Sequence, residues 1–531
     1  MGRGAGKVLT SGKLMACWLS LALPTVAADE PHSWLVPVLL PESASAWTGI
    51  GDGQQLVHTE RAATCTEAHA QLCEDSLSSA IDGTFTEITL PDGTNATHVA
   101  TGDIGDMWIR DSTEQLTAIL QHAEIKPDST TPEMRRALVG ALRAQAFFIL
   151  EDPYANSFRS SRVDSASLTK SDRGLRRVGW VATGNYELDS SGYFLRYMMD
   201  VAERCEELQL NPKDLLDADG LAHSAAKLVL KTWATERSHT AKSSYTYPEL
   251  SNHGKGAPVK DDIGLIWTGF GPSDNRYLHG YMISSNVFVA VVLERLAAFA
   301  TKVWKDEAMA DLAADLAAGI KKGLQAHGKA KGGHYCFTVD GLGGCEEMDD
   351  ANLPSLLSLP LLDPEQSIVE IDATILTRQW VLSKKNPYYN CGRRPATSEV
   401  CGIGSPHTQM EIPNGIWPMS VIVQRATAED ADEREACLAT LLTSAKAGGD
   451  ILHESFDPDS PMHWTRANFA WVDSLFARFA CDECWDGIGG VVSNASARVD
   501  RLRRYAGMRH GDAASFQVGS RSWRWLGLGR P

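Results

Sequence analysis

Apolar residues recur every three to four positions over most of the chain, which is the spacing of an amphipathic helix. The segments 289–303 and 469–479 show this period clearly. Further helices, each bounded by Gly, Pro, Asn or Asp, are predicted at 134–150, 194–209, 222–236, 307–324 and 434–447. Strand-like segments such as His334–Val339 are few, and strands and helices do not alternate regularly. The chain is therefore predicted to be mainly helical.

Four long segments between the predicted helices are rich in Gly, Trp, His, Asp and Asn. They span 101–113, 264–286, 386–418 and 450–468. Loops of this length in a compact domain are usually functional or disordered. Because disordered segments are poor in aromatic residues, the tryptophans and histidines predict functional loops.

The N-terminus has the layout of a secretory signal peptide. Arg3, Lys7 and Lys13 precede an apolar run from Leu14 to Ala27 that ends in small residues. An uncleaved membrane anchor is the alternative interpretation, although the run is short for a bilayer. We assign 1–28 to the signal peptide and expect no later membrane helix, so that the mature protein is soluble and secreted.

The rest of the chain divides into a large domain and a tail. Residues 29–486 carry the helical pattern and are assigned to one catalytic domain. Residues 487–531 are rich in Arg, Gly and Ser and show no clear helical period, so we treat them as an irregular tail.

Cysteines and sequons agree with an oxidising compartment. One of the eleven cysteines, Cys17, lies in the signal segment, and the other ten form an even set available for disulfides. Plausible local pairs are Cys65/Cys73, Cys336/Cys345 and Cys391/Cys401. A lone Cys481-x-x-Cys484 is too little for a structural zinc site, which needs four ligands. Two glycosylation sequons begin at Asn95 and Asn494.

The net charge of the chain argues against nucleic acid and anionic membranes as partners. The 531 residues carry a formal net charge of −17, so the chain has no basic footprint for nucleic acid or for an anionic membrane surface. An acidic surface is compatible with a neutral substrate such as a sugar.

The candidate chemistry lies in carboxylates that stand among aromatic residues in the long loops. These are Asp106, Asp111, Asp274 and Glu454. Aromatic rings stack on the apolar face of a pyranose, and a partly dry pocket raises the pKa of a carboxyl group. Glycoside cleavage needs two such groups, one to protonate the leaving oxygen and one on the opposite side of the ring. Each acid has the alternative role of capping a helix or pairing with an arginine.

Several blocks of sequence together resemble glycoside hydrolase family 125, in its fungal branch. They are Asp106-Met-Trp-Ile-Arg-Asp-Ser112, Tyr186-Glu-Leu-Asp-Ser190, Gly269-Phe-Gly-Pro-Ser-Asp-Asn275, Met348-Asp-Asp-Ala-Asn-Leu-Pro-Ser-Leu-Leu357, Lys384-Lys-Asn-Pro-Tyr-Tyr389, Gly402-Ile-Gly-Ser-Pro-His-Thr408, Ile416-Trp-Pro-Met-Ser420, and His453-Glu-Ser-Phe456 with the stretch through Arg466 to Leu475. The blocks run in order from about residue 34 to 480.

This resemblance implies an all-α fold, an (α/α)6 toroid with long active-site loops. It also implies exo-acting α-1,6-mannosidase activity on α-mannoside oligosaccharides, inversion at the anomeric carbon, and no metal or other cofactor. Carried over by position, Asp274 is the general acid and Glu454 is the general base.

Other site residues are assigned more loosely. Arg110 and Asp111 are expected to bind sugar hydroxyls, with a structural ion pair as the alternative. Trp108 and Trp471 are candidate stacking platforms, with core packing as the alternative. Arg466 is assigned to substrate binding.

Histidines and two further acids complete the candidates. His407, with His279 and His453, is expected to line the pocket, and of these we assign His407 to substrate binding. Asp349 and Asp350 either contact substrate or cap a helix, and we assign Asp350 to substrate contact.

Two features depart from the family pattern. Gly271 and Asn275 stand where we expect an arginine and an acid, which puts the contacts beside Asp274 in doubt. A segment from Cys391 to Cys401 resembles an inserted, disulfide-bonded hairpin. The alternatives are another inverting glycosidase of the same fold, for example one acting on glucans, and a catalytically silent sugar-binding relative.

Overall fold

The computed structural model describes residues 65–126, 129–392 and 400–485. The predicted signal peptide, the predicted tail and the sequon at Asn494 lie outside these residues. Within them the protein is mainly helical, as the apolar pattern predicts, and its strands are short and form small antiparallel sheets.

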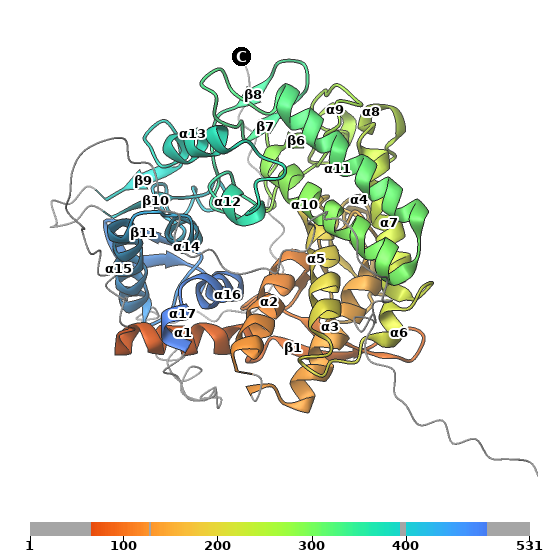
Figure 1. Cartoon of the computed structure of the whole chain (residues 1–531), viewed down its shortest axis with the longest axis horizontal. Coiled ribbons are helices and arrows are strands. Elements are labelled where there is room, and N and C mark those ends of the chain that lie inside the picture. Colours follow the sequence, from red (N-terminus) through yellow and green to blue (C-terminus); the bar gives the residue numbers. More distant parts are fainter. Residues whose placement is uncertain (1–64, 127–128, 393–399, 486–531) are drawn as a thin grey trace, which may run out of the picture.

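Helices surround the middle of the molecule in Figure 1. Those nearest the middle are α2 (Ile109–Ile125), α5 (Leu188–Arg204), α10 (Ile283–Phe299), α12 (Leu359–Leu362), α14 (Pro418–Ala426) and α16 (Ala470–Phe479). Those lying outside them are α1 (Glu67–Ile81), α3 (Pro132–Glu151), α7 (Leu221–Glu236), α11 (Glu307–His327), α13 (Ile371–Val381) and α15 (Ala431–Gly448). Short helices in the connections are α4 (Lys170–Gly174), α6 (Lys213–Leu216), α8 (His239–Lys242), α9 (Ser251–Gly254) and α17 (Asp482–Trp485).

The chain closes on itself, because helices from its two ends pack together. The N-terminal helix α1 packs on α16 and α2, and α16 packs on α2. Along the chain, α2 packs on α5, α5 on α10, and α10 on α11, while α14 packs on both α15 and α16. One continuous apolar core runs through these contacts.

The helices predicted from periodicity are confirmed. They correspond to α3, α5, α7, α11 and α15, although α5 begins six residues before the predicted start at 194. Local sequence explains two of the boundaries. The Thr131 side chain accepts a hydrogen bond from the Met134 amide with proline at the first helical position, and α15 ends at Gly449, whose φ is 98°.

One helical segment is as long and as apolar as a membrane helix, a length that was not expected from the sequence. The helical segment Ile283–Trp304 has the length and mean hydropathy, 1.6, of a membrane helix. It contains α10 and a following π-helical turn, Ala300–Trp304. Because it lies between α5 and α11 and 67% of its apolar window is buried in the protein, its hydrophobicity is explained by core packing.

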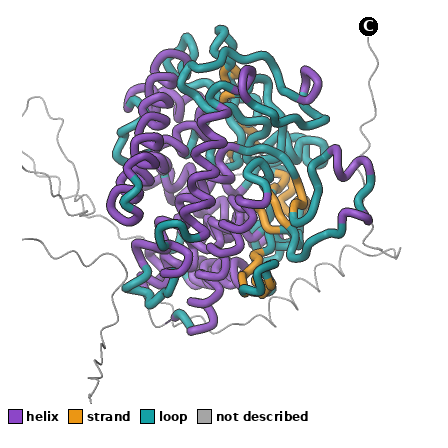
Figure 2. The backbone as a smooth tube through the Cα atoms, turned by 90° about the vertical axis from the view of Figure 1, so that its right-hand side faces the viewer, coloured by secondary structure: helices purple, strands orange, loops and turns teal. Residues whose placement is uncertain are grey.

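The strands and most loops lie on one side of the helices (Figure 2). The sheets are β1 (Phe85–Thr89) with β2 (Asn95–Val99), β3 (Met107–Trp108) with β4 (Ser157–Phe158) and β5 (Val181–Thr183), β6 (Tyr281–Met282) with β7 (Thr338–Val339) and β8 (Cys345–Glu346), β9 (Tyr389–Cys391) with β10 (Cys401–Ile403), and β11 (Ser455–Asp457) with β12 (Ser460–Thr465). The strand predicted at His334–Val339 is reduced to its last two residues. Strands β3 and β6 lead directly into α2 and α10, so this side carries the N-termini of those helices.

Disulfides differ in part from the local pairs expected. Cys336–Cys345 and Cys391–Cys401 are confirmed. The expected Cys65–Cys73 pair is wrong, because Cys65 bonds Cys484 and Cys73 bonds Cys481. The packing of α1 beside α16 and α17 places these cysteines together, and sequence proximity does not reveal it. Cys205 is also disulfide-bonded, whereas Cys437 is free and buried, so the ten cysteines do not all pair.

Candidate active site

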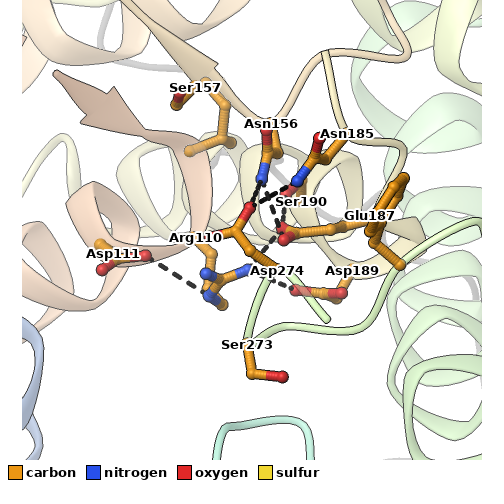
Figure 3. Close-up of polar contacts among 12 residues, drawn as sticks. Arg110, Asp111, Asn156, Ser157, Asn185, Glu187, Asp189, Ser190, Ser273 and Asp274 are labelled. Carbon is orange, nitrogen blue, oxygen red and sulfur yellow. Dashed lines mark hydrogen bonds and ion pairs between the residues drawn. The ribbon is translucent and has the colours of Figure 1, made fainter. Parts of the chain in front are cut away.

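Asp274, the expected general acid, is held by two asparagine side chains (Figure 3). Asn156 Nδ2 donates to Asp274 Oδ1 at 2.6 Å, and Asn185 Nδ2 donates to the same oxygen at 3.0 Å. Asp274 has a φ of 60°, a left-handed conformation that is uncommon outside glycine and recurs at functional sites. Asn156 precedes β4 and Asn185 precedes α5, so residues far apart in sequence converge on one carboxyl oxygen.

A buried charge cluster lies next to this pair of amides. Arg110, in the first turn of α2, donates from Nη1 to Glu187 Oε2 at 2.5 Å and to Asp189 Oδ2 at 3.5 Å. Its Nε lies 3.4 Å from Asp111 Oδ2. Asn156 Nδ2 also donates to Glu187 Oε1 at 2.9 Å, which links the cluster to Asp274. The ion pair considered as an alternative for Arg110 is thus present, and its main partners come from the start of α5.

Burial controls the ionisation of this cluster. It raises the pKa of Asp111 to about 6, against the opposing charges of Arg110 and Arg466 and with the like charge of Asp274. Burial likewise raises the pKa of Asp189 to about 6 and the pKa of Glu187 well above its usual value, although Arg110 opposes both shifts. The site therefore concentrates several carboxyl groups around one arginine, so the charge on each acid depends on its neighbours.

Glu454, the expected general base, lies just before β11 and is 6% exposed. Burial raises its pKa, while the positive charge of Arg466 and the nearby His407 oppose the rise. Arg466 Nη1 is 3.7 Å from Glu454 Oε1. A buried carboxylate of raised pKa, beside one cation, is a stronger proton acceptor than an exposed glutamate.

The position of Arg466 is itself fixed by the loop before α2. Asp103 Oδ1 accepts hydrogen bonds from Arg466 Nε, at 2.9 Å, and from Nη2, and the Thr101 carbonyl accepts another from Nη2. The guanidinium lies over the Phe469 ring, 4.4 Å from its centroid. These contacts leave Nη1 facing Glu454. Asp111 senses the charges of both Arg466 and Asp274, which places it within electrostatic range of both.

Several buried polar atoms at this site form no hydrogen bond with any described residue, although Arg110 Nε and Asp111 Oδ2 are ion-paired with each other. Within the described residues, no hydrogen bond is formed by Trp108 Nε1, Arg110 Nε, Asp111 Oδ2 or Trp471 Nε1. Buried polar groups are usually satisfied, so a cluster of unsatisfied donors and acceptors suits a ligand that carries hydroxyl groups.

Comparisons with known proteins bear on this geometry. Residues 66–481 match the model of a family described as metal-independent α-mannosidases, glycoside hydrolase family 125. The chain belongs to glycoside hydrolase family 125. It is therefore an α-mannosidase by family and a glycoside hydrolase by reaction class, as the motif blocks indicate.

Two similar proteins support the assignment. The meiotically up-regulated gene 157 protein of Schizosaccharomyces pombe is 32% identical, over 78% of this chain and 82% of that protein. A metal-independent α-mannosidase of Streptococcus pneumoniae, solved in a non-productive complex with α-1,6-mannobiose, is 29% identical with a TM-score of 0.65. That match covers 79% of this chain and 94% of the bacterial one.

The departure from the family pattern at Gly271 has a steric cause in this mannosidase. A Cβ atom at residue 271 would lie 2.0 Å from the Tyr277 ring. Ser273 Oγ and the Tyr277 hydroxyl are 2.6 Å apart, and that hydroxyl donates to Asp350 Oδ2 at 2.6 Å. Tyr277 thus occupies the space beside residue 271 and connects the loop of Asp274 to Asp350.

Asp350 and Asp349 take different structural roles. Asp350 is fully buried, and its Oδ1 accepts hydrogen bonds from the Asn352 amide and from its side chain. Asp349 accepts hydrogen bonds from the Leu356 and Leu357 amides of the loop before α12, so it holds this loop and does not cap the helix, and burial raises its pKa to about 8. The substrate contact assigned to Asp350 remains a prediction.

The aromatic and histidine candidates are placed differently. Trp471 is 1% exposed, and the Arg110 guanidinium lies 4.6 Å from its ring centroid, which favours core packing over a sugar platform. Trp108 is half-buried. His407 is exposed and close enough to affect the Glu454 pKa. His453 is buried, and its nitrogens lie at hydrogen-bond distance from two backbone carbonyls. His279 pairs with Asp340 at 3.6 Å.

Possible metal ligands gather at the chain ends, away from the residues around Asp274. In the described part of the chain, the groups close enough to share an ion are Cys65, His69 and Cys484, and His69, Cys73 and Cys481. The cysteines are bonded in disulfides, so their sulfurs are not thiolate ligands, and His69 Nε2 is at hydrogen-bond distance from the Ala480 carbonyl.

Four polar residues of the site received no role from sequence reasoning. Glu187 and Asp189 lie in a block that carried the family resemblance, and that block was the available signal. Asn156 and Asn185 stand in unremarkable loops, and only the fold brings them to Asp274.

Proposed function

We propose that this protein is an inverting exo-α-1,6-mannosidase that releases terminal α-mannose from mannosides, including oligosaccharides of the N-glycan type. Asp274 is the general acid and Glu454 is the general base. The observation that carries the assignment is the pair of asparagine amides on a single oxygen of Asp274, together with a buried Glu454 beside one arginine. The bacterial relative solved with α-1,6-mannobiose supports the linkage.

The arrangement of helices supports an (α/α)6 toroid. The helices near the middle alternate along the sequence with helices outside them, and α1, the first helix described, is an outer one. In such a ring the N-termini of the inner helices face one side. Arg110 and Asp111 begin α2 and Asp189 begins α5, so these side chains meet at that side.

The two amides define how Asp274 donates its proton. Each Nδ2 can only donate, so Oδ1 must act as an acceptor. The proton is thereby directed to Oδ2, the oxygen left for the glycosidic oxygen of the substrate.

Glu454 would activate the water on the opposite side of the ring. Burial gives Glu454 a raised pKa, which makes it a better proton acceptor, and the positive charge of Arg466 opposes that rise. Inversion requires room for that water, so we expect the Asp274 and Glu454 carboxyl groups to be roughly 6.5–9.5 Å apart, whereas roughly 5–5.5 Å would indicate retention.

Recognition of the terminal mannose would use the unsatisfied atoms of the charge cluster. Asp111 Oδ2 is an acceptor, and Arg110 Nε and Trp108 Nε1 are donors. A sugar hydroxyl both donates and accepts, so one sugar can satisfy atoms of both kinds. We keep Asp350, His407 and Arg466 as proposed substrate-binding residues, and Trp471 only through its indole Nε1, because its ring is packed in the core.

We also propose that the protein passes through the secretory pathway. Four disulfides among the described residues are consistent with an oxidising compartment. N-terminal sequencing of secreted protein should begin near Ala28, and an intact Met1 on membrane-bound protein would identify an anchor instead.

The function is tested by incubating the purified protein with α-1,6-, α-1,3- and α-1,2-linked mannobiose and following the product by proton NMR. We expect cleavage of the α-1,6 linkage with β-mannose appearing first. Glu454→Gln should abolish turnover of all substrates, whereas Asp274→Asn should impair most the substrates with poor leaving groups. Initial α-mannose, or wild-type turnover by Glu454→Gln, would show that the acid and base are misassigned. Glucosidic disaccharides in the same panel test the glucan-directed alternative.

A further inference from the structure

A trough away from the catalytic residues lies between the β1–β2 hairpin and α3. It has a volume of about 680 Å³, within the usual range of ligand pockets of roughly 300–1,000 Å³. The hairpin contributes Phe85, Glu87, Asn95 and Thr97, and α3 contributes a face that includes Arg136, Gly140 and Arg143. Gln209 and Asn211, after α5, line it as well. We call this the α3 trough.

Asn95 is the acceptor of the sequon Asn95-Ala-Thr97, and its side chain lines the trough. In the hairpin register Asn95 is opposite Thr89 and Thr97 is opposite Glu87. Side chains directly opposite one another share a face of a sheet, so Phe85, Glu87, Asn95 and Thr97 all lie on one face. Asn95 is exposed, and its Nδ2 donates to Glu87 Oε1 at 3.1 Å, which orients the amide.

The lining suits a neutral, hydroxyl-rich ligand better than an ion. The charges balance, since Arg135, Arg136 and Arg143 are matched by Glu87, Glu133 and Asp214. Arg136 pairs with Glu133 at 2.9 Å and Arg143 with Asp214 at 2.8 Å. Arg135 donates to Gln209 Oε1 at 2.7 Å. Arg136 and Arg143 are ion-paired, whereas Arg135 and Glu87 contact neutral amides, so the trough offers amide and guanidinium hydrogen-bonding groups, together with the half-buried ring of Phe85 for a sugar face.

We propose that Asn95 is N-glycosylated and that the α3 trough seats the first sugars of that glycan. The Asn95 amide nitrogen gives up one of its two hydrogens as a proton and bonds to the anomeric carbon of the first N-acetylglucosamine. The lipid diphosphate of the oligosaccharide donor leaves with the electron pair of the broken bond. The remaining N–H keeps the contact with Glu87, so the new bond is directed along the trough. The seated glycan then covers the gap between the hairpin and α3.

The test uses full-length protein secreted from a eukaryotic host and carrying Asn494→Gln, which leaves Asn95-Ala-Thr97 as the single sequon in the sequence. Peptide mass spectrometry should find Asn95 occupied. Release of the glycan from native protein by peptide N-glycosidase should be about tenfold slower than from denatured protein, equivalent to about 1.4 kcal/mol of protection. Arg136→Ala and Phe85→Ala should both accelerate native release, whereas Arg162→Ala, at an exposed arginine outside the trough, should not.

Each outcome is decisive. An unoccupied Asn95, or native release as fast as denatured release, overturns the proposal. If release from native protein is slow and is equally slow in Arg136→Ala and Phe85→Ala, the glycan does not lie in the α3 trough and the proposal is overturned. Arg136 is exposed, so its variant tests the trough even if Phe85→Ala unfolds. Turnover of α-1,6-mannobiose, measured on the same samples, reports whether each variant is folded.

Discussion

Replacing Asn185 with alanine should slow the enzyme in a way that depends on the leaving group. Asn185 Nδ2 donates to Asp274 Oδ1 at 3.0 Å, and Asn156 supplies the second donor to that oxygen. Without Asn185, the Asp274 carboxyl loses one of the two contacts that direct its proton to Oδ2. The residue does not touch the base, Glu454, in any contact that the structure describes, so activation of water should be unaffected.

The magnitude follows from the single hydrogen bond that is lost. A hydrogen bond contributes about 1 kcal/mol net, and about 1.4 kcal/mol corresponds to a tenfold change in rate. Asn185→Ala should therefore lower kcat on α-1,6-mannobiose roughly 5- to 10-fold. A dinitrophenyl α-mannoside needs little protonation of its leaving group, so its kcat should change less than about twofold.

Ser190→Ala provides the matched control. Ser190 Oγ donates to Glu187 Oε2 at 2.9 Å, so this variant removes one hydrogen bond from the same cluster and leaves both contacts to Asp274. It should affect the two substrates equally. If Asn185→Ala slows the disaccharide and the dinitrophenyl mannoside by the same factor, or slows neither, the amides do not position the acid and our reasoning about Oδ1 is refuted.

Three further predictions concern the base, metals and Tyr277. The positive charge of Arg466 opposes the burial that raises the Glu454 pKa. Arg466→Gln should therefore raise that pKa further and move the acidic limb of the kcat/KM pH profile to higher pH. An unmoved limb would show that Arg466 does not act on the charge of Glu454. Activity should survive EDTA, because the family is described as metal-independent. A loss of activity that only added Ca²⁺ or Zn²⁺ reverses would show that this enzyme requires a metal ion. Gly271→Arg should lower both Tm and turnover, because even a Cβ at residue 271 would overlap the Tyr277 ring, and a second change, Tyr277→Gly, should partly restore Tm.

Periodicity predicted the helices because each helix buries one stripe of its own local sequence. The predicted segments 222–236 and 434–447 match α7 and α15 within a few residues. The exception, α5, begins earlier because Leu188 to Leu195 is buried on every side, so no polar face marks the start of the helix. The amphipathic period of 289–303 did not reveal that the whole segment Ile283–Trp304 is as long and as apolar as a membrane helix, because residues 283–290 are all buried in the core and show no exposed face.

Site residues could be predicted from the sequence only where a residue of suitable chemistry lies within one of the motifs that resemble the family. Asp274 and Glu454 lie in motifs that carry the family resemblance, and the structure adds their surroundings. Asn156 and Asn185 are separated from Asp274 by 118 and 89 residues, so no local pattern connects them with it. The same limit applies to Arg110, whose partners in α5 lie more than seventy residues away along the chain.

The disulfides Cys65–Cys484 and Cys73–Cys481 join the two ends of the described fold, with sequence separations of 419 and 408 residues. In the chain-entropy model either bond alone closes this long loop, which is worth about 6 kcal/mol as an upper estimate. Once one bond is present, the second closes only the short loop through 65–73 and 481–484, worth about 3 kcal/mol or less.

Removal of the two bonds should therefore be non-additive. Replacing either pair of cysteines by serine should lower the free energy of unfolding modestly and by a similar amount for each pair. Replacing all four should lower it by clearly more than twice that amount, because only then is the loop of about four hundred residues released. Urea unfolding of the three variants measures this difference. Strictly additive losses would show that the bonds act through local packing of α1 against α16 and α17, and that closing the chain contributes nothing of its own.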